Sequence, residues 1–410
     1  MATESVKYLL VGGGTAAAQA AVGIRELDKD GTVLIVAREN HIPYDRPPLS
    51  KGFVKFQPED PADIESKDST WYPQNNVSLR TGTEVTRVDR DAKAALLSDG
   101  STVAYEKLLL ATGSTPRSLD IPGSDMAHVF TYRTVDDAQT IREMAKGIQN
   151  VVLVGGGYIG MELGATLRQL GKNVTIIHRG KHPWDNFASA ITGNFLQAYF
   201  ENQGVRFLME DEPEQIAGNG RAQTVRTKKG HAPSADLVIV GVGVELNTSL
   251  AQESGLSVDK GIPVNEYLQS EEDPSVWVAG DIAAYTDRVA DKRWHAEHHM
   301  NAKWTGKQAG RNMAGANEPF SQVAYFFSDM FDLEVVLRGS PGSVHSTKVL
   351  GDLDTANFVE LYSDQQGVVR MAIGVTRDNE RYGAMETALE KLVLEKRNAR
   401  DVTPADAGLV

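Results

Sequence analysis

The chain has 410 residues, 55 acidic and 42 basic side chains, a formal net charge of −13, and no cysteine. This length predicts two or three domains, and the acidic balance argues against a nucleic-acid binder. The lack of cysteine excludes a structural disulfide, a Cys-ligated zinc, a thiol nucleophile and a redox-active disulfide. No apolar run reaches membrane-spanning length and no charged-then-apolar leader begins the chain, so we expect a soluble, cytoplasmic protein without a membrane span.

The first predicted elements in chain order are a strand, a glycine-rich loop, a helix and a second strand. The strand Tyr8–Val11 leads into Gly12, Gly14 and Ala17 at G-x-G-x-x-A spacing, and an alanine-rich helix and the strand Thr32–Ala37 follow. Glycines in such a loop let the backbone approach a pyrophosphate, and the helix N-terminus offers it free N–H groups. The segment therefore predicts a dinucleotide-binding unit.

The same arrangement returns in the middle of the chain. The strand Val151–Val154 leads into Gly155, Gly157 and Gly160 at G-x-G-x-x-G spacing, and a helix and the strand Asn173–His178 follow. One such loop is a weak signal, because tight glycine turns also occur in ordinary α/β units. Two loops in the same context are a much stronger signal, and they predict two bound dinucleotides, a flavin and a nicotinamide.

Residues at the ends of the second strands predict which nucleotide each unit prefers. Glu39 lies near the offset of ~20 residues at which a carboxylate contacts a ribose hydroxyl. In the second unit His178 and Arg179, with Lys181 close behind, take that place, without a carboxylate. Cations there suit a 2′-phosphate, so NADPH is favoured over NADH. The alternative is that these are solvated loop residues, which leaves NADH open.

Three further strand-like runs predict crossings between nucleotide domains. Leu108–Arg117 and Leu237–Asn247 are apolar strands that run into glycine, and Ser275–Ile282 ends in Gly280 and Asp281. An Asp at the end of such a strand can reach the ribityl chain of FAD. These runs support the prediction of a flavin and a nicotinamide site in one chain.

The chain resembles the FAD- and NAD(P)-dependent two-Rossmann reductases along essentially its whole length. The likeness is closest to the branch that contains apoptosis-inducing factor, plant-type monodehydroascorbate reductase and the ferredoxin reductases of oxygenase systems. The segments that carry the likeness are GGGTAAA (12–18), ARENHIPYDRPPLSKG (37–52), GGGYIGMELG (155–164), AGDIA (279–283), AEHHMNAKWTG (296–306) and YFFSDMFDLEVVLRG (325–339).

The resemblance implies an α/β fold class, with two Rossmann-like dinucleotide-binding domains, for FAD and NAD(P), plus a small α+β C-terminal domain. The FAD-binding domain would cover 1–115 and 245–317, and the NAD(P)-binding domain would be inserted at 116–244. Residues 318–410 would form the C-terminal domain, which is of the reductase dimerisation type, although the oligomeric state stays open. The first loop would then hold FAD, and the second would hold the NADPH or NADH that reduces it.

The resemblance also implies the residues of hydride transfer. Lys51 is expected beside flavin N5, and the prolines before it stiffen the loop that presents it. Glu162 is expected to pair with Lys51 across the domain interface and so to orient the nicotinamide. Arg46 and Pro47 are expected to contact the flavin. From the residues alone, an exposed lysine and a glutamate favoured by the helix dipole are the plainer interpretation.

A histidine-rich helix is expected to begin at the flavin pyrimidine. The resemblance implies that its positive end stabilises negative charge on the flavin, with Glu297 and His298 at the isoalloxazine edge and His298 as a catalytic candidate. His295, His298 and His299 share one helical face, which can suit zinc. However, H-E-x-x-H and a third-ligand motif are absent from the sequence, so no metal is expected.

Other expected contacts follow from the same resemblance. Phe327 stands where the two named relatives hold a Tyr or Trp near the flavin, and it is a catalytic and cofactor-binding candidate. Lys303 stands where monodehydroascorbate reductases have an arginine, and both departures weaken the case for an ascorbyl radical as acceptor. The remaining expected cofactor contacts are Gly12, Gly14, Thr15, Ala16, Glu39, Ala111, Thr112, Gly113, Arg117, Gly155, Gly157, Tyr158, Ile159, Gly243, Gly280 and Asp281.

The lack of cysteine decides the class of electron acceptor. Electrons must leave the flavin directly, so we expect a FAD-dependent NAD(P)H oxidoreductase that gives single electrons to a ferredoxin-type protein or a monodehydroascorbate-like radical. A quinone reductase and a redox sensor of the apoptosis-inducing-factor type, with slow oxidase activity, are the alternatives. Lys303, Lys307 and Arg311 form a basic stripe, interpreted as a solvated face, with a docking surface for an acidic electron carrier as the alternative.

Overall fold

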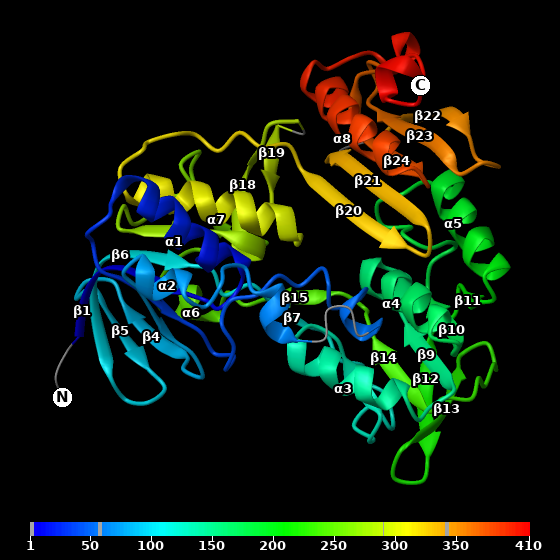
Figure 1. Cartoon of the computed structure of the whole chain (residues 1–410), viewed down its shortest axis with the longest axis horizontal. Helices are drawn as coiled ribbons and strands as arrows, with labels where there is room; N and C mark the ends of the chain where they lie inside the picture. The colour runs from blue at the N-terminus through cyan, green and yellow to red at the C-terminus, as the bar shows by residue number, and fades with distance from the viewer. Residues whose placement is uncertain (1–3, 56–59, 290, 341–343) are drawn as a thin grey trace. The chain divides into compact units, whose positions relative to one another are not determined.

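The computed structural model of the chain describes residues 4–55, 60–289, 291–340 and 344–410 (Figure 1). It divides into two compact units. Unit 1 comprises Met1–Asp45, Asp60–Thr115 and Leu246–Tyr325, and unit 2 comprises Arg46–Glu59, Pro116–Glu245 and Phe326–Val410. Within the described residues, no helix is both long and apolar enough to cross a membrane.

Unit 1 is built on a seven-stranded sheet. Its strands are β1 (Glu4–Val11), β2 (Val33–Val36), β3 (Val77–Arg80), β4 (Val85–Asp89), β5 (Ala94–Leu97), β6 (Thr102–Leu110) and β17 (Val276–Val278). The order is β3-β2-β1-β6-β5-β4, and β17 also pairs with β6. β3, β2, β1, β6 and β17 run parallel, whereas β5 pairs antiparallel with both β4 and β6. All four residues of β2 are buried, as parallel strands covered on both faces require.

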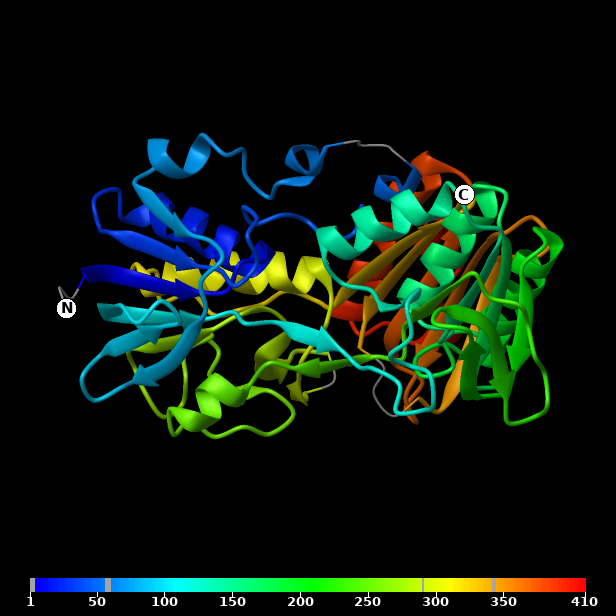
Figure 2. The same cartoon turned by 90° about the horizontal axis from the view of Figure 1, so that it is seen from below.

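Helices α1 (Thr15–Leu27) and α7 (His299–Met313) pack against each other in unit 1, as both views show (Figure 1, Figure 2). A Cβ on Gly306 would stand 2.2 Å from the Ala16 carbonyl oxygen, and one on Gly310 would stand 2.0 Å from that of Ala20. The two backbones therefore touch, and only glycine fits at the crossing. The other elements of unit 1 are α2 (Trp71–Gln74), α6 (Ser249–Glu253), β16 (Ile262–Pro263), β18 (Ala283–Asp287), β19 (Lys292–Trp294), η2 (Pro61–Ile64) and η3 (Gly280–Ile282).

Gly310→Ala is expected to destabilise the protein by about 1–3 kcal/mol, because the added methyl group has no space at the α1–α7 crossing. Gly383→Ala is the matched control, since Gly383 also lies inside a helix and a Cβ there meets no atom within 4 Å. The control should gain about 1 kcal/mol from helix propensity. Urea unfolding measures the free energy of unfolding of both variants. An equal gain in this free energy for Gly310→Ala and Gly383→Ala would contradict the close contact between α1 and α7.

Unit 2 contains a five-stranded, all-parallel sheet in the order β11-β10-β9-β14-β8. The strands are β8 (Val129–Thr131), β9 (Asn150–Val154), β10 (Asn173–His178), β11 (Arg206–Met209) and β14 (Leu237–Val240). The unit also has α3 (Val135–Ala145), α4 (Tyr158–Gln169), α5 (Ala190–Asn202), η1 (Phe53–Lys55) and the antiparallel hairpin β12 (Pro213–Gly218) and β13 (Ala222–Thr227). Two short strands, β7 (Ser114–Pro116) and β15 (Val244–Leu246), lie where the chain passes from one unit to the other.

A second five-stranded sheet, in the order β20-β21-β24-β23-β22, forms the C-terminal part of the chain, and α8 packs on β21 and β24. Its elements are β20 (Tyr325–Met330), β21 (Leu333–Gly339), β22 (Ser346–Asp352), β23 (Asn357–Ser363), β24 (Val369–Thr376), α8 (Asn379–Leu394), η4 (Ala399–Asp401) and η5 (Ala405–Ala407). The buried Glu360 carboxylate of β23 accepts hydrogen bonds from the Ser189 and Thr192 hydroxyls at the start of α5, at 2.5 and 2.6 Å. These bonds join the sheet to the rest of unit 2.

The predicted α/β class, with two Rossmann-like sheets and a small α+β part, is confirmed. The predicted strand at Ser275–Ile282 is shorter than expected. It ends at Val278 because Gly280 has a φ of +76° and begins the 3-10 helix η3. The division of the chain into an FAD, an NAD(P) and a C-terminal domain stays a prediction.

Candidate active site

The first glycine loop lies in unit 1, between β1 and α1. Gly12 has a φ of +137°, and a Cβ on it would stand 2.1 Å from the Ala111 carbonyl oxygen, so only glycine fits. Gly14 is the N-cap of α1, and a Cβ there meets no atom within 4 Å. The loop is thus tight at its first glycine and open at its second.

The second glycine loop, between β9 and α4 in unit 2, has the same form. A Cβ on Gly155, whose φ is +115°, would stand 2.2 Å from the Gly241 carbonyl oxygen, and one on Gly160 would stand 2.0 Å from that of Gly155. Gly157 is the N-cap of α4, and a Cβ there meets no atom within 4 Å. Both predicted loops therefore leave open space directly above a helix N-terminus.

The N-termini of α1 and α4 differ from those of the other described helices that are longer than five residues. α3, α5 and α8 are capped by the side chains of Thr134, Ser189 and Asp378. α1 and α4 have no side-chain cap and no acidic residue in the first turn. Backbone N–H groups at these two ends can therefore bind an anion such as a pyrophosphate. The residues present fit one dinucleotide in each unit.

Several predicted flavin contacts gather around the first loop. The Thr15 hydroxyl donates to Asp45 Oδ1 at 3.1 Å, and His299 Nε2 at the start of α7 lies 3.9 Å from the other oxygen of Asp45. A Cβ on Gly280 would stand 3.3 Å from the Ala16 Cβ. The glycine loop, η3 and the start of α7 therefore lie close together within unit 1.

Asp281 and His298 are both held by polar contacts in this region. The Ser114 hydroxyl donates to Asp281 Oδ2 at 2.6 Å, and Asp281 is buried. His298 is the N-cap of α7, where its Nδ1 accepts the Met300 N–H at 3.3 Å. Glu297 lies 3.3 Å from His295 Nε2. Because the helix begins only at His299, with His298 as its cap and His295 outside it, the three histidines do not share one helical face as predicted.

Other predicted cofactor contacts form hydrogen bonds within the protein. Glu39 Oε2 accepts the Tyr44 hydroxyl at 2.5 Å, and Tyr44 pairs with Gly14 of the first loop. Thr112, between Ala111 and Gly113, donates its hydroxyl to a backbone carbonyl at 2.6 Å. Arg117 belongs to unit 2, and its backbone N–H donates to the Gly243 carbonyl at 3.0 Å.

The predicted ion pair of Lys51 and Glu162 is present. Lys51 Nζ lies 2.9 Å from Glu162 Oε1, and the two side chains are only 16% and 6% exposed. The position of the pair differs from the prediction, because both residues belong to unit 2 rather than facing each other across an interface. Phe327, also in unit 2, has its ring centroid 5.5 Å from Lys51 Nζ, within the range of a cation–π interaction.

Residues 46–55 belong to unit 2 through contacts that the sequence does not reveal. The Tyr132 hydroxyl donates to the Leu49 carbonyl at 2.7 Å, and the Thr166 hydroxyl donates to the Ser50 carbonyl at 2.9 Å. Arg46 Nη1 donates to the Arg133 carbonyl at 2.6 Å. The Pro47 carbonyl lies 3.5 Å from Lys51 Nζ. The expected flavin contacts of Arg46 and Pro47 stay predictions.

Two serines and an aspartate that the sequence does not single out lie beside the ion pair. Ser328 Oγ donates to Glu162 Oε1 at 2.7 Å, and Ser50 Oγ donates to Glu162 Oε2. Asp329 adds a second carboxylate nearby. Partial burial raises the pKa of Asp329, while the charge of Lys51 lowers it and that of Glu162 raises it.

An aromatic cluster stands at the start of α4. The Tyr158 ring stacks on those of Phe187 and Phe326, with centroids 4.8 and 5.9 Å apart, and lies 4.9 Å from Trp184. Burial, together with the charge of Glu162, raises the pKa of Tyr158 well above its usual value, which keeps the hydroxyl protonated. Ile159, the next residue, is 36% exposed, so it can reach a ligand.

The end of β10 carries the residues predicted to select the nucleotide. His178 Nδ1 accepts the Gly156 N–H of the second loop at 3.1 Å, and its Nε2 lies 3.0 Å from Asp185 Oδ1. Arg179 and Lys181 are exposed. No carboxylate stands at this strand end in the sequence, but the loop after β10 brings Asp185 to His178. His178 therefore helps to shape the loop, and the expected binding of a 2′-phosphate at this strand end stays a prediction.

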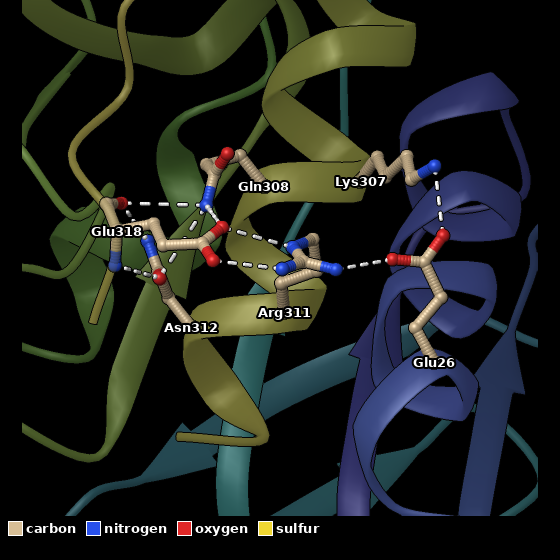
Figure 3. A network of polar contacts seen from close by, with 6 residues as sticks. All are labelled: Glu26, Lys307, Gln308, Arg311, Asn312 and Glu318. Carbon is tan, nitrogen blue, oxygen red and sulfur yellow. Dashed lines mark hydrogen bonds and ion pairs between the residues drawn. The ribbon is translucent and has the colours of Figure 1, made fainter. Parts of the chain in front are cut away.

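The basic stripe on α7 is largely occupied by ion pairs within unit 1 (Figure 3). Glu26 of α1 accepts Lys307 Nζ at 2.8 Å and also pairs with Arg311, which in turn lies 2.8 Å from Glu318. A hydrogen bond from Lys307, helped by Arg311, lowers the pKa of Glu26. Lys307 and Arg311 thus join α7 to its neighbours through ion pairs, while Lys303 and Lys307 both stay exposed.

In the part of the chain that the structure describes, no three His, Asp or Glu side chains are grouped so that they could hold a metal ion. The three histidines near α7 instead contact Asp45, Glu297 and the backbone of Met300.

Comparisons with known proteins find relatives along most of the chain. The chain is 32% identical over 375 residues to the anthranilate 1,2-dioxygenase system ferredoxin–NAD(+) reductase component of Burkholderia cepacia, covering 90% of this chain and 91% of that protein. It is 31% identical over 374 residues to apoptosis-inducing factor 3 of Homo sapiens, covering 90% of this chain and 61% of that protein. Both relatives lie in the branch that the sequence motifs resemble, so that prediction is confirmed.

Solved structures show the same fold. The ferredoxin reductase for the CYP199A2 system from Rhodopseudomonas palustris matches with a TM-score of 0.89 and 26% identity, covering 99% of this chain and 97% of that one. The putidaredoxin reductase–putidaredoxin complex matches with a TM-score of 0.90 and 27% identity, covering 98% of this chain and 95% of that one.

A family model described as pyridine nucleotide-disulphide oxidoreductase matches residues 6–306. The predictions of an NAD(P)H-dependent flavoprotein reductase and of FAD and NAD(P)H as its cofactors are confirmed at this level. The chain has no cysteine, so it cannot carry the disulphide in the family's name. With both glycine loops, the fold and most of its length in agreement, the chain belongs to the pyridine nucleotide-disulphide oxidoreductase family.

Proposed function

We propose that the protein is an NAD(P)H-dependent flavoprotein reductase that gives electrons one at a time to a ferredoxin-type protein. The observation that carries the proposal is the pair of uncapped helices, α1 and α4, one in each unit. Each begins at a glycine beside which a Cβ would meet nothing within 4 Å. Two separate pyrophosphate sites in one chain suit a flavin and a nicotinamide dinucleotide.

When bound, FAD accepts a hydride from NAD(P)H and can release the two electrons singly. In unit 1, the α1 N-terminus, Asp281 and the start of α7 would hold FAD. In unit 2, the α4 N-terminus would bind the nicotinamide dinucleotide, and Glu162 would hold the Lys51 ammonium group near the start of that helix. The expected places of Lys51 beside flavin N5 and of His298 at the isoalloxazine edge stay predictions.

A ferredoxin-type acceptor is proposed because the chain has no cysteine to pass electrons through and because its relatives include ferredoxin–NAD(+) reductase components. The test is NADH-dependent reduction of a purified [2Fe–2S] ferredoxin, with a rubredoxin, a quinone and oxygen as competing acceptors. Turnover with the ferredoxin at least ten times faster than with oxygen alone is the expected result. Fast turnover with the quinone only would make the protein a quinone reductase.

A redox sensor is the second candidate, because apoptosis-inducing factor 3 is similar over 90% of this chain. A sensor would be reduced slowly and would keep the oxidised nicotinamide bound for minutes. The long-lived reduced form would then bind different partners from the oxidised form. The lifetime of the long-wavelength charge-transfer band after one equivalent of NADH separates the two functions. A band that decays within one turnover of the ferredoxin assay supports the reductase.

Arg179→Gln is expected to lower kcat/KM for NADPH by about tenfold and to leave that for NADH within about twofold, because Arg179 is the exposed cation next to His178. His178 itself is a poor target, since its ring accepts the Gly156 N–H of the second loop. Initial rates with both nucleotides give the ratio. A protein that uses NADH at least as well as NADPH before the substitution would contradict the predicted preference.

The cytoplasmic location expected from the sequence also stays a prediction. Fractionation of cells that make the tagged full-length chain, followed by immunoblotting of cytoplasmic and membrane fractions, tests it directly.

A further inference from the structure

The Glu162 carboxylate of α4 is buried and receives hydrogen bonds from three donors. Lys51 Nζ lies 2.9 Å and Ser328 Oγ 2.7 Å from Oε1, and Ser50 Oγ donates to Oε2. The donors come from two other segments of unit 2, the 46–55 loop and β20. Because every partner donates, both carboxylate oxygens must accept, and the orientation of the carboxyl group is fixed.

Strand β20 contacts both members of the ion pair. Ser328 binds Glu162, and the ring of the preceding residue, Phe327, lies 5.5 Å from Lys51 Nζ. Ser328 itself is fully buried. The ammonium group is therefore held between a ring and a carboxylate whose rotation the Ser328 hydroxyl restricts. Without that hydroxyl, Oε1 would keep Lys51 as its one donor, and the carboxyl group could turn.

We propose that Ser328 is a positioning residue for hydride transfer, which acts by fixing the Glu162 carboxylate and, through it, the Lys51 ammonium group. This inference rests on the proposed function of the same site. It gives the C-terminal sheet a direct role in the reductive half-reaction, in addition to any role in assembly. Ser50, which donates to the other carboxylate oxygen, acts in the same way from the loop side.

The test compares Ser328→Ala, Ser328→Thr and Ser328→Val in the FAD-loaded protein. Thr and Val have nearly the same shape, but only Thr keeps the hydroxyl. Loss of the hydroxyl is expected to lower the limiting rate of flavin reduction by NADH about tenfold in the Ala and Val variants, because small displacements of charged groups slow positioned reactions strongly. Ser328→Thr should recover most of the rate, and the Kd for NADH should stay unchanged in all three.

Thr192→Val is the matched control. Thr192 is also fully buried and donates to a buried carboxylate of unit 2, that of Glu360, at 2.6 Å. It should change the melting temperature of the protein but leave the rate of flavin reduction unchanged. Calorimetric titration of NAD+ and the intensity of the charge-transfer band add readouts that do not depend on turnover, and only Ser328→Ala and Ser328→Val should weaken the band.

Equal rates for Ser328→Thr and Ser328→Val would overturn the proposal, and so would a parallel loss of rate in Thr192→Val. If Ser328→Ala does not retain FAD, the Thr and Val pair still decides the outcome. If neither the Thr nor the Val variant holds FAD, the test moves to Ser50→Ala. That variant must show the same loss in the rate of flavin reduction with an unchanged Kd for NADH, and an unchanged rate would overturn the proposal. Failure of the proposed function looks different, because neither NADH nor NADPH would then reduce the flavin of the unsubstituted protein.

Discussion

Lys51→Met is expected to slow the reduction of the flavin by NADH by about 10²- to 10³-fold, the usual effect of removing one electrostatic group from an active site. The reason is the place of the ammonium group, 2.9 Å from the buried Glu162 carboxylate and 5.5 Å from the Phe327 ring. Methionine keeps much of the side-chain volume but removes the charge. FAD content should not change, because the groups proposed to hold FAD, which are the α1 N-terminus, Asp281 and the start of α7, all lie in unit 1.

The same substitution is expected to lower the free energy of unfolding by about 1–3 kcal/mol, since the carboxylate loses one of its three donors. Lys55→Met is the control, because Lys55 belongs to the same segment but donates to Gln169 at 2.7 Å on the surface. Stopped-flow traces at saturating NADH give the rates. A rate for Lys51→Met equal to that of the control would remove Lys51 from the reaction.

Gly157→Leu is expected to abolish NAD+ binding, with a Kd raised by more than about 100-fold, while FAD stays bound. Gly157 has a φ of −82° and a Cβ on it meets nothing within 4 Å, so leucine fits the free protein without strain. Its side chain would fill the space above the α4 N-terminus that a pyrophosphate needs. Gly14→Leu should give the opposite result, a protein without FAD, because Gly14 has the same open position on α1.

Gly147→Leu is the control for both substitutions, since a Cβ at Gly147 also meets no atom within 4 Å and this glycine lies outside the two loops. It should keep both ligands. Flavin absorbance of the purified proteins and calorimetric titration with NAD+ measure the two occupancies separately. If Gly157→Leu loses FAD but still binds NAD+, the second loop would be the FAD site and the first loop the nicotinamide site.

Much of the fold was predictable because it depends on local sequence patterns. The apolar runs that precede Gly12 and Gly155 fix the strands β1 and β9, and the glycine spacing fixes the turns into α1 and α4. The ends of these elements agree with the predictions to within a few residues. The strand expected to reach Ile282 ends earlier because Gly280 takes a positive φ, which a run of apolar residues does not reveal.

The surroundings of the candidate site were less predictable, because they depend on contacts between distant segments. Ser50 and Ser328 stand next to Lys51 and Phe327 in the motifs LSK and FFSD, so adjacency was the only signal for them. Nothing local to Asp185 indicates that it reaches His178. The stripe on α7 was interpreted from spacing alone, and only the structure places Glu26 and Glu318 against it.

Anaerobic mixing of the purified, FAD-loaded protein with NADH and with NADPH in a stopped-flow spectrophotometer tests the central claim most directly. The account predicts bleaching of the flavin bands within about a second, in a two-electron step whose rate saturates with nucleotide concentration. The oxidised nicotinamide should leave before the next turnover. A flavin that neither nucleotide reduces, or that is reduced at a rate independent of nucleotide, would contradict the account.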